Sequence, residues 1–237
     1  MTETWLILQS PADSAAWNMA LDEALLRTAP DRDCPLLRVY SWRQPAVSIG
    51  YFQKFPAHLA EKYEIVRRPT GGGLVYHGDG VDTTYTVVVP QSDPLYKMNT
   101  AEAYCAIHQA VAAAVEFVVG RPESFRGGAS VASISHVGGS RPTIEEKTRR
   151  YECFQNPVRG DVVDDGRKLA GGAQRRSKTG RLHQGSIAAT VTADGLKRAF
   201  AEAFDADFHG YELSPAERAL AEKLVREKYS TVAWNQR

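Results

Sequence analysis

Residues 65–89 read IVRRPTGGGLVYHGDGVDTTYTVVV, and the rest of the chain is best interpreted from this stretch. Its centre holds three consecutive glycines, which destabilise an ordinary helix or strand and therefore need another explanation. Either the glycines form a tight hairpin turn, or they leave the backbone open so that a ligand can lie directly on it. Arg67 and Arg68 on one side and His77 on the other favour a ligand site, and the arginines suggest an anionic or carbonyl-rich ligand.

The composition is that of an ordinary globular protein. The chain has 237 residues, of which 43% are apolar and 24% charged, which is enough for a substantial core. A formal charge of +1 provides no electrostatic basis for binding nucleic acid or a membrane surface. No apolar run approaches the length needed to span a bilayer. We therefore expect neither a nucleic acid nor a membrane as partner.

The three cysteines are far apart and contain no Cys-x-x-Cys pair. Cys34, Cys105 and Cys153 suggest neither a disulfide scaffold nor a zinc site, and free thiols point to a reducing compartment. The six histidines show no metal-ligand spacing, so no metal is expected. The first ten residues, MTETWLILQS, lack the features of a signal peptide. These observations predict a cytoplasmic protein.

Patterns in the first part of the chain predict several strands and one helix. Asp13 or Ser14 is expected to cap this helix, in which Trp17, Leu21 and Leu25 recur every four residues. The strands are expected at residues 6–8, 36–40, 46–49 and 84–89.

Residues 100–119 form the clearest predicted helix. Thr100 is the expected N-cap, and Gly120 stands where a C-cap glycine belongs. Cys105 and His108 on this helix are expected to serve packing. One apolar face is formed by Tyr104, Ile107, Val111, Val115 and Val118.

The remaining sequence predicts a long loop, a hairpin and two helices. Residues 121–150 lack periodicity, and this loop is either a functional lid or a passive insertion. Asp164-Asp165-Gly166 is a good hairpin turn. Strands are expected at 151–163, 167–173 and 186–191, with a turn at 177–180, and helices at 196–204 and from 214 to about 229. With no repeat or linker, we expect one domain over residues 1–237, of α+β class with a mixed or antiparallel sheet.

Two residues near the predicted hairpin suggest covalent chemistry. A lone cysteine is usually a small buried apolar residue, and a lone lysine is usually solvated. A hairpin, however, folds the chain back on itself, so Cys153 and Lys168 are candidates to meet on one face of the sheet. A lysine cation nearby would lower the pKa of the thiol and produce a nucleophilic thiolate. No Walker loop, dinucleotide fingerprint or Gly-x-Ser-x-Gly elbow is present.

Several stretches resemble one known family. They are NMALDE at 18–23, QPAVSIG at 44–50, RRPTGGGLVYH at 67–77, GRKLAGGAQRR at 166–176 and LHQGSI at 182–187. In this order they resemble the biotin/lipoate protein ligase and octanoyltransferase superfamily. The segment Cys153-Phe154-Gln155-Asn156-Pro157 is similar to the octanoyltransferase branch whose nucleophile lies in a Cys-Phe-x-x-Pro motif.

This resemblance implies a fold and a set of site residues. The fold is a single α+β domain whose mixed, largely antiparallel β-sheet is flanked by helices. An acyl tunnel would lie beneath the 67–77 loop and beside the 168–174 strand, with Leu74, Tyr76 and Leu169 as candidate lining. Cys153 and Lys168 would be catalytic, Lys168 by contacting the acyl carbonyl or acyl-phosphate oxygen. The implied substrate-binding residues are Arg68, Thr70, Gly71, Gly72, Gly73, His77, Gly171, Gly172, Ala173, Gln174, His183, Gly185 and Ser186.

The resemblance also implies a reaction. An octanoyl group would pass from acyl carrier protein to Cys153 as a thioester, and then to a lysine of a lipoyl domain of the 2-oxoacid dehydrogenases or of the glycine cleavage H protein. No cofactor or metal is needed. Either Lys168 or His77 could help the acceptor lysine lose its proton. A monomer is expected, with acidic partners guided by basic residues, namely Arg67, Arg68, Arg175, Arg176, Lys178 and Arg181.

Three alternatives remain open. A lipoate ligase of the same family would use ATP and Mg²⁺, although residues 79–84 read DGVDTT where ligases tend to have asparagines. An amidotransferase would move the acyl group between lipoyl proteins. A non-catalytic acyl or nucleotide binder is the third. Dependence on ATP and on Cys153 discriminates among them.

Overall fold

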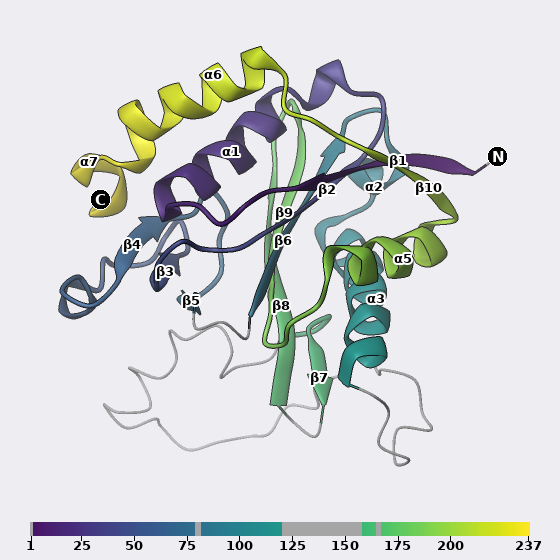
Figure 1. The fold of residues 1–237 in the computed structure, drawn as a ribbon, viewed down its shortest axis with the longest axis horizontal. Helices are drawn as coiled ribbons and strands as arrows, with labels where there is room; N and C mark the ends of the chain where they lie inside the picture. Colours follow the sequence, from purple (N-terminus) through teal and green to yellow (C-terminus); the bar gives the residue numbers. More distant parts are fainter. Residues whose placement is uncertain (1, 79–81, 120–157, 165–166) are drawn as a thin grey trace.

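The fold consists of two β-sheets with helices packed against them (Figure 1). The computed structural model describes residues 2–78, 82–119, 158–164 and 167–237. The larger sheet has the strand order β10-β1-β2-β6-β9-β8-β7, and the smaller one the order β4-β3-β5. In the larger sheet β1 runs parallel to β10 and β2, and the other pairings are antiparallel. The predicted α+β fold with a mixed, largely antiparallel sheet is confirmed.

The strands have the following bounds: β1 Glu3–Gln9, β2 Leu36–Tyr40, β3 Ala46–Ile49, β4 Glu64–Arg67, β5 Val75–His77, β6 Thr83–Pro90, β7 Val162–Asp164, β8 Arg167–Arg176, β9 Gly180–Ile187 and β10 Ala206–Gly210. The helices are α1 Ala15–Arg27, α2 Pro94–Lys97, α3 Thr100–Val119, α5 Ala193–Phe204, α6 Pro215–Leu224 and α7 Val232–Asn235, with a π-helical segment at Val225–Tyr229 and short 3₁₀ turns at Ala29–Asp31 and Ala57–Leu59. No helix among the described residues is both long and apolar enough to cross a membrane.

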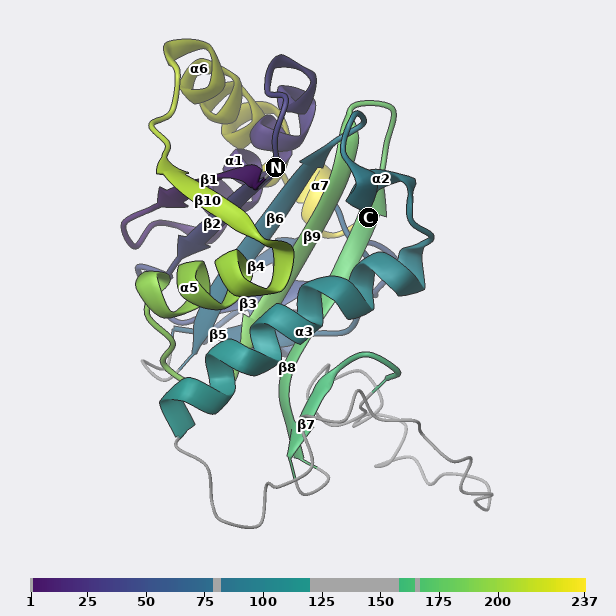
Figure 2. The ribbon, with the colours of Figure 1, turned by 90° about the vertical axis from the view of Figure 1, so that its right-hand side faces the viewer.

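Each face of the larger sheet carries its own pair of helices. Helices α3 and α5 cover one face, which is turned to the viewer in Figure 2, and α1 and α6 cover the other. Strand β6 is buried along its whole length because its side chains contribute to the apolar cores on both faces of the sheet. Its residues alternate, so that Tyr85 and Val87 pack toward α3 whereas Val88 packs toward α1.

Side-chain caps explain where the helices begin. Ser14 accepts a hydrogen bond from the backbone N–H of Trp17 at the start of α1, as one of the two predicted caps. At α3 the predicted cap was wrong. Asn99 rather than Thr100 accepts from the N–H of Glu102, at 2.9 Å, and Glu102 accepts from the N–H of Asn99 in return. The reciprocal pair is a capping box, so the helix begins at Thr100, one residue earlier than a Thr100 cap requires.

Three further expectations about the fold need correction. The strand predicted at 186–191 lies instead at Gly180–Ile187, as β9. Its polar residues are buried and have partners inside the protein, so the strand is not marked by an apolar run. Strand β10 was not predicted, since it is a short edge strand that pairs with β1 alone. Val118 is 43% exposed and does not belong to the buried face of α3. The predicted loop at 121–150 lies outside the described residues, as do Gly120 and Cys153.

Candidate active site

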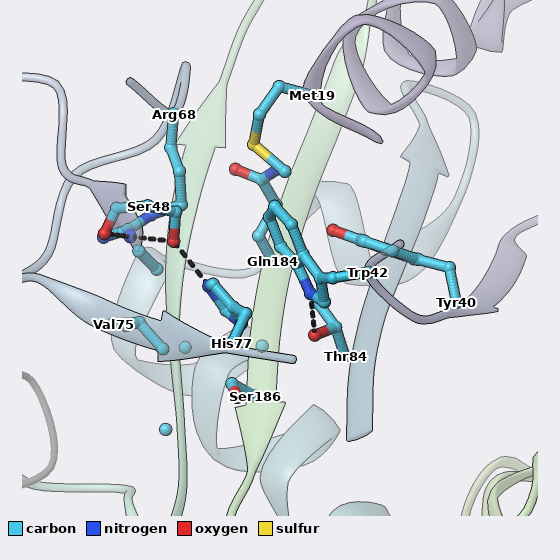
Figure 3. A pocket seen from close by; sticks show the side chains of 14 residues that line it. Met19, Tyr40, Trp42, Ser48, Arg68, Val75, His77, Thr84, Gln184 and Ser186 are labelled. Carbon is cyan, nitrogen blue, oxygen red and sulfur yellow. Dashed lines mark hydrogen bonds between the residues drawn. The ribbon is translucent and has the colours of Figure 1, made fainter. Parts of the chain in front are cut away.

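A pocket opens between the two sheets, with about 410 Å³ of empty space that is partly open to solvent. The smaller sheet contributes residues of β3 and β5, the larger sheet contributes residues of β6, β8 and β9, and α1 contributes Met19 (Figure 3). The lining is Met19, Tyr40, Trp42, Ser48, Arg68, Val75, His77, Thr84, Gly171, Gly172, Ala173, Gln184, Gly185 and Ser186. Several polar groups therefore converge on a partly apolar pocket, as in many ligand sites.

Arg68 ties the glycine-rich loop to β3. Its Nη2 donates to the carbonyl oxygens of Gly71 and Gly73, and its Nη1 donates to Ser48 O and Oγ at 2.8 and 2.7 Å. Gly72 has a φ of 84°, which a residue with a side chain rarely adopts. Loop and strand are also in close contact, because a Cβ at Gly50 would overlap the Gly72 carbonyl oxygen. The three glycines are thus held against the end of β3 by Arg68 and by the close approach of Gly50, next to the pocket and outside its lining.

His77 lines the pocket and contacts a serine, a tryptophan and an aspartate. Its Nε2 is 2.7 Å from Ser48 Oγ, and its ring stacks on Trp42 with centroids 4.0 Å apart. Its Nδ1 faces the Asp82 carboxylate at 3.5 Å. Burial lowers the pKa of His77 and so favours the neutral imidazole, although Asp82 opposes this shift. A neutral imidazole is able to accept a proton.

A β-bulge places Lys168 next to Gly171, which lines the opposite wall of the pocket. Val162 pairs with Ala170 and Val163 with Lys168, so β8 has one extra residue at this step. The bulge shifts the alternation by one residue and brings Lys168 to the same side as Gly171, three positions away. The end of the lysine side chain fills the space that a Cβ on Gly171 would need. The ammonium therefore lies against a glycine that lines the pocket.

The Lys168 ammonium forms a buried ion pair with Asp161. Their Nζ and Oδ2 atoms are 2.8 Å apart, and both side chains are almost inaccessible to solvent. Asp161 also accepts from the Tyr104 hydroxyl at 2.5 Å and from the Val158 N–H at 2.7 Å. Tyr104 in turn accepts from the Gly172 N–H. This network holds one cation in a fixed position, where it is suited to stabilising a developing negative charge on an acyl oxygen.

Gln174 and His183 lie on the opposite side of the β8–β9 pair from the pocket lining. Gln174 Oε1 accepts from Arg181, which leaves its Nε2 to donate to His183 Nδ1 at 3.1 Å. His183 Nε2 then donates to the Tyr85 hydroxyl at 3.1 Å. Burial lowers the pKa of His183 well below its usual value. In this structure the pair connects β8, β9 and β6 and lies outside the pocket lining, so substrate contact by Gln174 and His183 stays a prediction.

The polar residues of the NMALDE motif are structural. Asp22 forms an ion pair with Arg38 at 2.6 Å, and both side chains are fully buried. Asp22 also accepts from Gln184 Nε2 at 2.7 Å, and Thr70 Oγ1 donates to Gln184 Oε1 at the same distance. These contacts fix Gln184 in the pocket wall. Thr70 consequently acts on the pocket through Gln184.

Of the predicted substrate-binding residues, those that line the pocket are Arg68, His77, Gly171, Gly172, Ala173, Gly185 and Ser186. Those that do not are Thr70, Gly71, Gly72, Gly73, Gln174 and His183. Met19, Ser48 and Gln184 also line the pocket and were not predicted, although all three lie inside the motifs. Trp42, another lining residue, lies outside every motif. The catalytic role of Cys153 remains a prediction, since this residue lies outside the described part of the chain.

The predicted lining and the predicted steering residues need correction. Val75 and His77 point into the pocket, so Leu74 and Tyr76 point away from it; Leu74 packs in a small core with Val47 and Ile49. Leu169 packs on the α3 side. Three arginines predicted to guide partners, Arg67, Arg68 and Arg181, are buried and bonded within the protein, whereas Arg175, Arg176 and Lys178 are exposed.

No group of three or more His, Cys, Asp or Glu residues suited to a metal ion is found in the described part of the chain. Cys34 and Cys105 are free thiols.

Comparison with known proteins identifies relatives across the whole chain. Residues 14–212 match the model of the lipoyl protein ligase A/B catalytic domain. The chain is 31% identical to octanoyltransferase LipM of Halalkalibacterium halodurans, over 98% of this chain and 99% of that one. It is 29% identical to octanoyltransferase LipM of Bacillus subtilis, over 98% of both chains.

Solved structures agree with the family match. A putative lipoate protein ligase from T. acidophilum with bound lipoic acid superposes with a TM-score of 0.72 and 25% identity over the full length of both chains. A lipoate-protein ligase A bound with ATP, at 23% identity over 100% of this chain and 99% of that one, has the same fold with a TM-score of 0.71. The chain belongs to the lipoyl protein ligase A/B catalytic domain family.

Proposed function

We propose that the protein is an octanoyltransferase, which moves an octanoyl group from acyl carrier protein to a lysine of a lipoyl domain or of the glycine cleavage H protein. The observation that carries this proposal is the match to relatives named octanoyltransferase over nearly the full length of both chains. A related structure pairs a bipartite lipoate protein ligase with its E2 lipoyl domain, which supports a lipoyl domain as acceptor. The proposal includes a monomeric enzyme in the cytoplasm, without cofactor or metal.

The proposed chemistry has two half-reactions. The Cys153 thiolate attacks the donor thioester, and the electron pair of the carbonyl moves onto oxygen until the pantetheine thiolate leaves. The Lys168 ammonium, held by Asp161 against Gly171, stabilises that oxygen. In the second half-reaction the acceptor amine attacks the acyl-cysteine, and an amide replaces the thioester. Exchange of one thioester for another is nearly isoenergetic, so ATP is not required.

The test is the formation of an acyl-enzyme without nucleotide. Intact-mass measurement after incubation with octanoyl-acyl carrier protein should show one octanoyl adduct, and Cys153→Ala should abolish both the adduct and transfer to a lipoyl domain. Cys34→Ala is the matched control, because this thiol lies outside the pocket, and it should retain both.

Two results would reject this proposal. Strict dependence on ATP with free lipoate, together with full activity of Cys153→Ala, would identify a ligase. A strong preference for octanoylated lipoyl protein over acyl carrier protein as donor would identify an amidotransferase.

A further inference from the structure

Amide formation requires a group that takes a proton from the acceptor nitrogen. A lysine side chain has a reference pKa of about 10.4, so the acceptor arrives mostly as an ammonium and first loses one proton to solvent. The neutral amine then attacks, and its nitrogen carries a surplus proton once the new bond has formed. The two candidates near the pocket are Lys168 and His77. The inference rests on the proposed function. The contacts of each side chain show which of the two residues is suited to accept the proton.

Lys168 is placed to stabilise charge and not to accept a proton. Its ammonium is 2.8 Å from Asp161, whose carboxylate is surrounded by the donors Tyr104 and Val158. Removing the lysine proton would leave a buried carboxylate without its counter-charge, which is strongly unfavourable. The pair is thus best suited to keep a positive charge at Gly171 throughout the reaction.

The hydrogen-bond directions around His77 leave one nitrogen ready to accept. Asp82 presents a carboxylate, which accepts only, so the Nδ1 that faces it carries the hydrogen. Among the described residues neither His77 Nδ1 nor Asp82 Oδ2 has a hydrogen-bond partner, although the two face each other at 3.5 Å. In the neutral ring Nε2 is then bare and accepts from Ser48 Oγ at 2.7 Å.

Ser48 is oriented from its other side. Arg68 Nη1 donates to Ser48 Oγ at 2.7 Å, and a guanidinium cannot accept, so the serine hydrogen is directed to His77 (Figure 3). The resulting order of donation is Arg68 to Ser48, Ser48 to His77 and His77 toward Asp82. The same order of contacts, from hydroxyl to imidazole to carboxylate, activates hydroxyl groups in many hydrolases.

Position in the pocket separates His77 from the other histidines. Of the five histidines in the described ranges, His77 belongs to the pocket lining, and Ser48 lies beside it. Gly171, against which the Lys168 ammonium lies, lines the same pocket. A carbonyl held there has a fixed cation and a proton acceptor in one cavity. Stacking on Trp42 keeps the imidazole from rotating away.

We propose that Ser48, His77 and Asp82 form the proton-accepting relay of the amide-forming step. The acceptor nitrogen forms its bond to the acyl carbon and loses a proton to Ser48 Oγ, while the serine proton passes to His77 Nε2. Asp82 stabilises the imidazolium. The carbon–sulfur bond then breaks, its electron pair leaves with the sulfur, and the proton returns from His77 through Ser48 to that sulfur. Counted from the neutral amine, atoms and charges balance without a further reactant.

The first experiment separates the two half-reactions. Enzyme is loaded with octanoyl-acyl carrier protein and then mixed with lipoyl domain in a single turnover. In His77→Gln and in Ser48→Ala the transfer rate should fall by about 100-fold or more, the usual contribution of a general base, whereas the amount of acyl-enzyme should stay within about threefold. His209→Gln, which removes an exposed histidine of β10, is the control and should transfer normally.

The second experiment uses pH to distinguish a proton acceptor from a structural histidine. The charged groups that face His77 are Asp82, which raises its pKa, and Arg68, which lowers it. Transfer by the wild-type enzyme should fall as the pH drops through the lowered pKa of His77. Asp82→Asn removes the raising charge, so the acidic limb of the transfer rate should move to lower pH, and the rate at neutral pH should also decrease.

The outcomes are distinguishable. If the wild-type protein forms no acyl-enzyme, the proposed function fails, and the relay fails with it. If the wild-type protein loads and transfers but His77→Gln transfers at a near-normal rate, the relay alone is overturned. An acidic limb that stays in place in Asp82→Asn also overturns it.

Discussion

The two sides of the β8–β9 pair carry similar residues and use them differently. On the side facing α3, His183 has each ring nitrogen bonded within the protein, to Gln174 and to Tyr85. On the pocket side, His77 from the smaller sheet has one nitrogen on a pocket serine and the other 3.5 Å from a carboxylate. Both rings are buried and neutral. Burial therefore does not distinguish the two histidines. The histidine proposed to accept a proton is the one whose hydrogen-bond partner, Ser48, lines the pocket.

The glycines of β8 and β9 show the same division. A Cβ at Gly185 would overlap the ring and hydroxyl of Tyr85, which is fully buried. A Cβ at Gly172 would overlap His183. A Cβ at Gly171, by contrast, would overlap only the end of the Lys168 side chain and approach Asp161. Gly185 and Gly172 therefore leave space for the packed rings of Tyr85 and His183, whereas Gly171 leaves space for the Lys168 ammonium.

The largest expected effect is a contrast between two identical substitutions. Gly185→Ala forces a methyl group against the immobile Tyr85 ring and should reduce the free energy of unfolding by about 3 kcal/mol, near the upper end for overpacking. Gly171→Ala displaces the end of the buried Lys168 side chain from Asp161, so it should also be destabilising, and in the protein that folds it should slow acyl transfer at least tenfold because the ammonium moves. Urea denaturation and single-turnover transfer measure the two effects. Equally slow transfer by folded Gly185→Ala and folded Gly171→Ala would contradict the division of the pair into a packing side and a side that holds the proposed catalytic cation.

The second expected effect is acid sensitivity of the α3 side. His108 donates from Nδ1 to Gly160 O at 2.7 Å, and burial lowers its pKa to about 4. The unfolded chain, in which histidine titrates near 6.5, therefore binds more protons than the folded protein between these values. The free energy of unfolding consequently falls as the pH falls, and this one histidine should contribute a loss of about 2 kcal/mol between pH 7 and pH 5.

His108→Gln tests this assignment, because glutamine can donate to Gly160 O without titrating. Urea denaturation at pH 7, 6 and 5 should show a shallower decline for the variant than for the wild-type protein. An unchanged decline would mean that His108 is not a source of the acid sensitivity. His77 differs from His108 in that, under the proposed relay, its titration should also appear in the transfer rate.

Much of the fold could be predicted because it depends on local patterns. The limits of β2, β3 and α3 agree with the predicted 36–40, 46–49 and 100–119, since apolar periodicity and flanking turn residues act over a few positions. The same holds for the helix that begins after Ser214, where the structure shows a capping box between Ser214 and Glu217. Motif resemblance also located half of the residues that line the pocket, because segments 67–77, 166–176 and 182–187 converge there.

What could not be predicted depends on the partner strand. The choice of Leu74 and Tyr76 as lining selected the wrong side of β5, and a shift of one residue reverses every side chain of a strand. The bulge in β8 that brings Lys168 to Gly171 exists only in the pairing with β7. Strand β10 pairs with β1 from the other end of the chain. None of these features has a signal within a short window of sequence.

The smallest expected effect tests the start of α3, which carries Tyr104 and His108. Asn99 and Glu102 hold each other's backbone N–H groups, whereas Thr100 makes no cap contact of this kind. Asn99→Ala should therefore lower the free energy of unfolding by about 1 kcal/mol, the usual cost of losing a cap, and Thr100→Ala should change it by less than about 0.5 kcal/mol. Urea denaturation of the two variants provides the measurement. Because the capping box lies outside the pocket, neither variant should change the rate of transfer from loaded enzyme. If Thr100→Ala proved the more destabilising of the two, the helix would begin where the sequence pattern alone predicted, and the placement of Tyr104 on Asp161 would need another support.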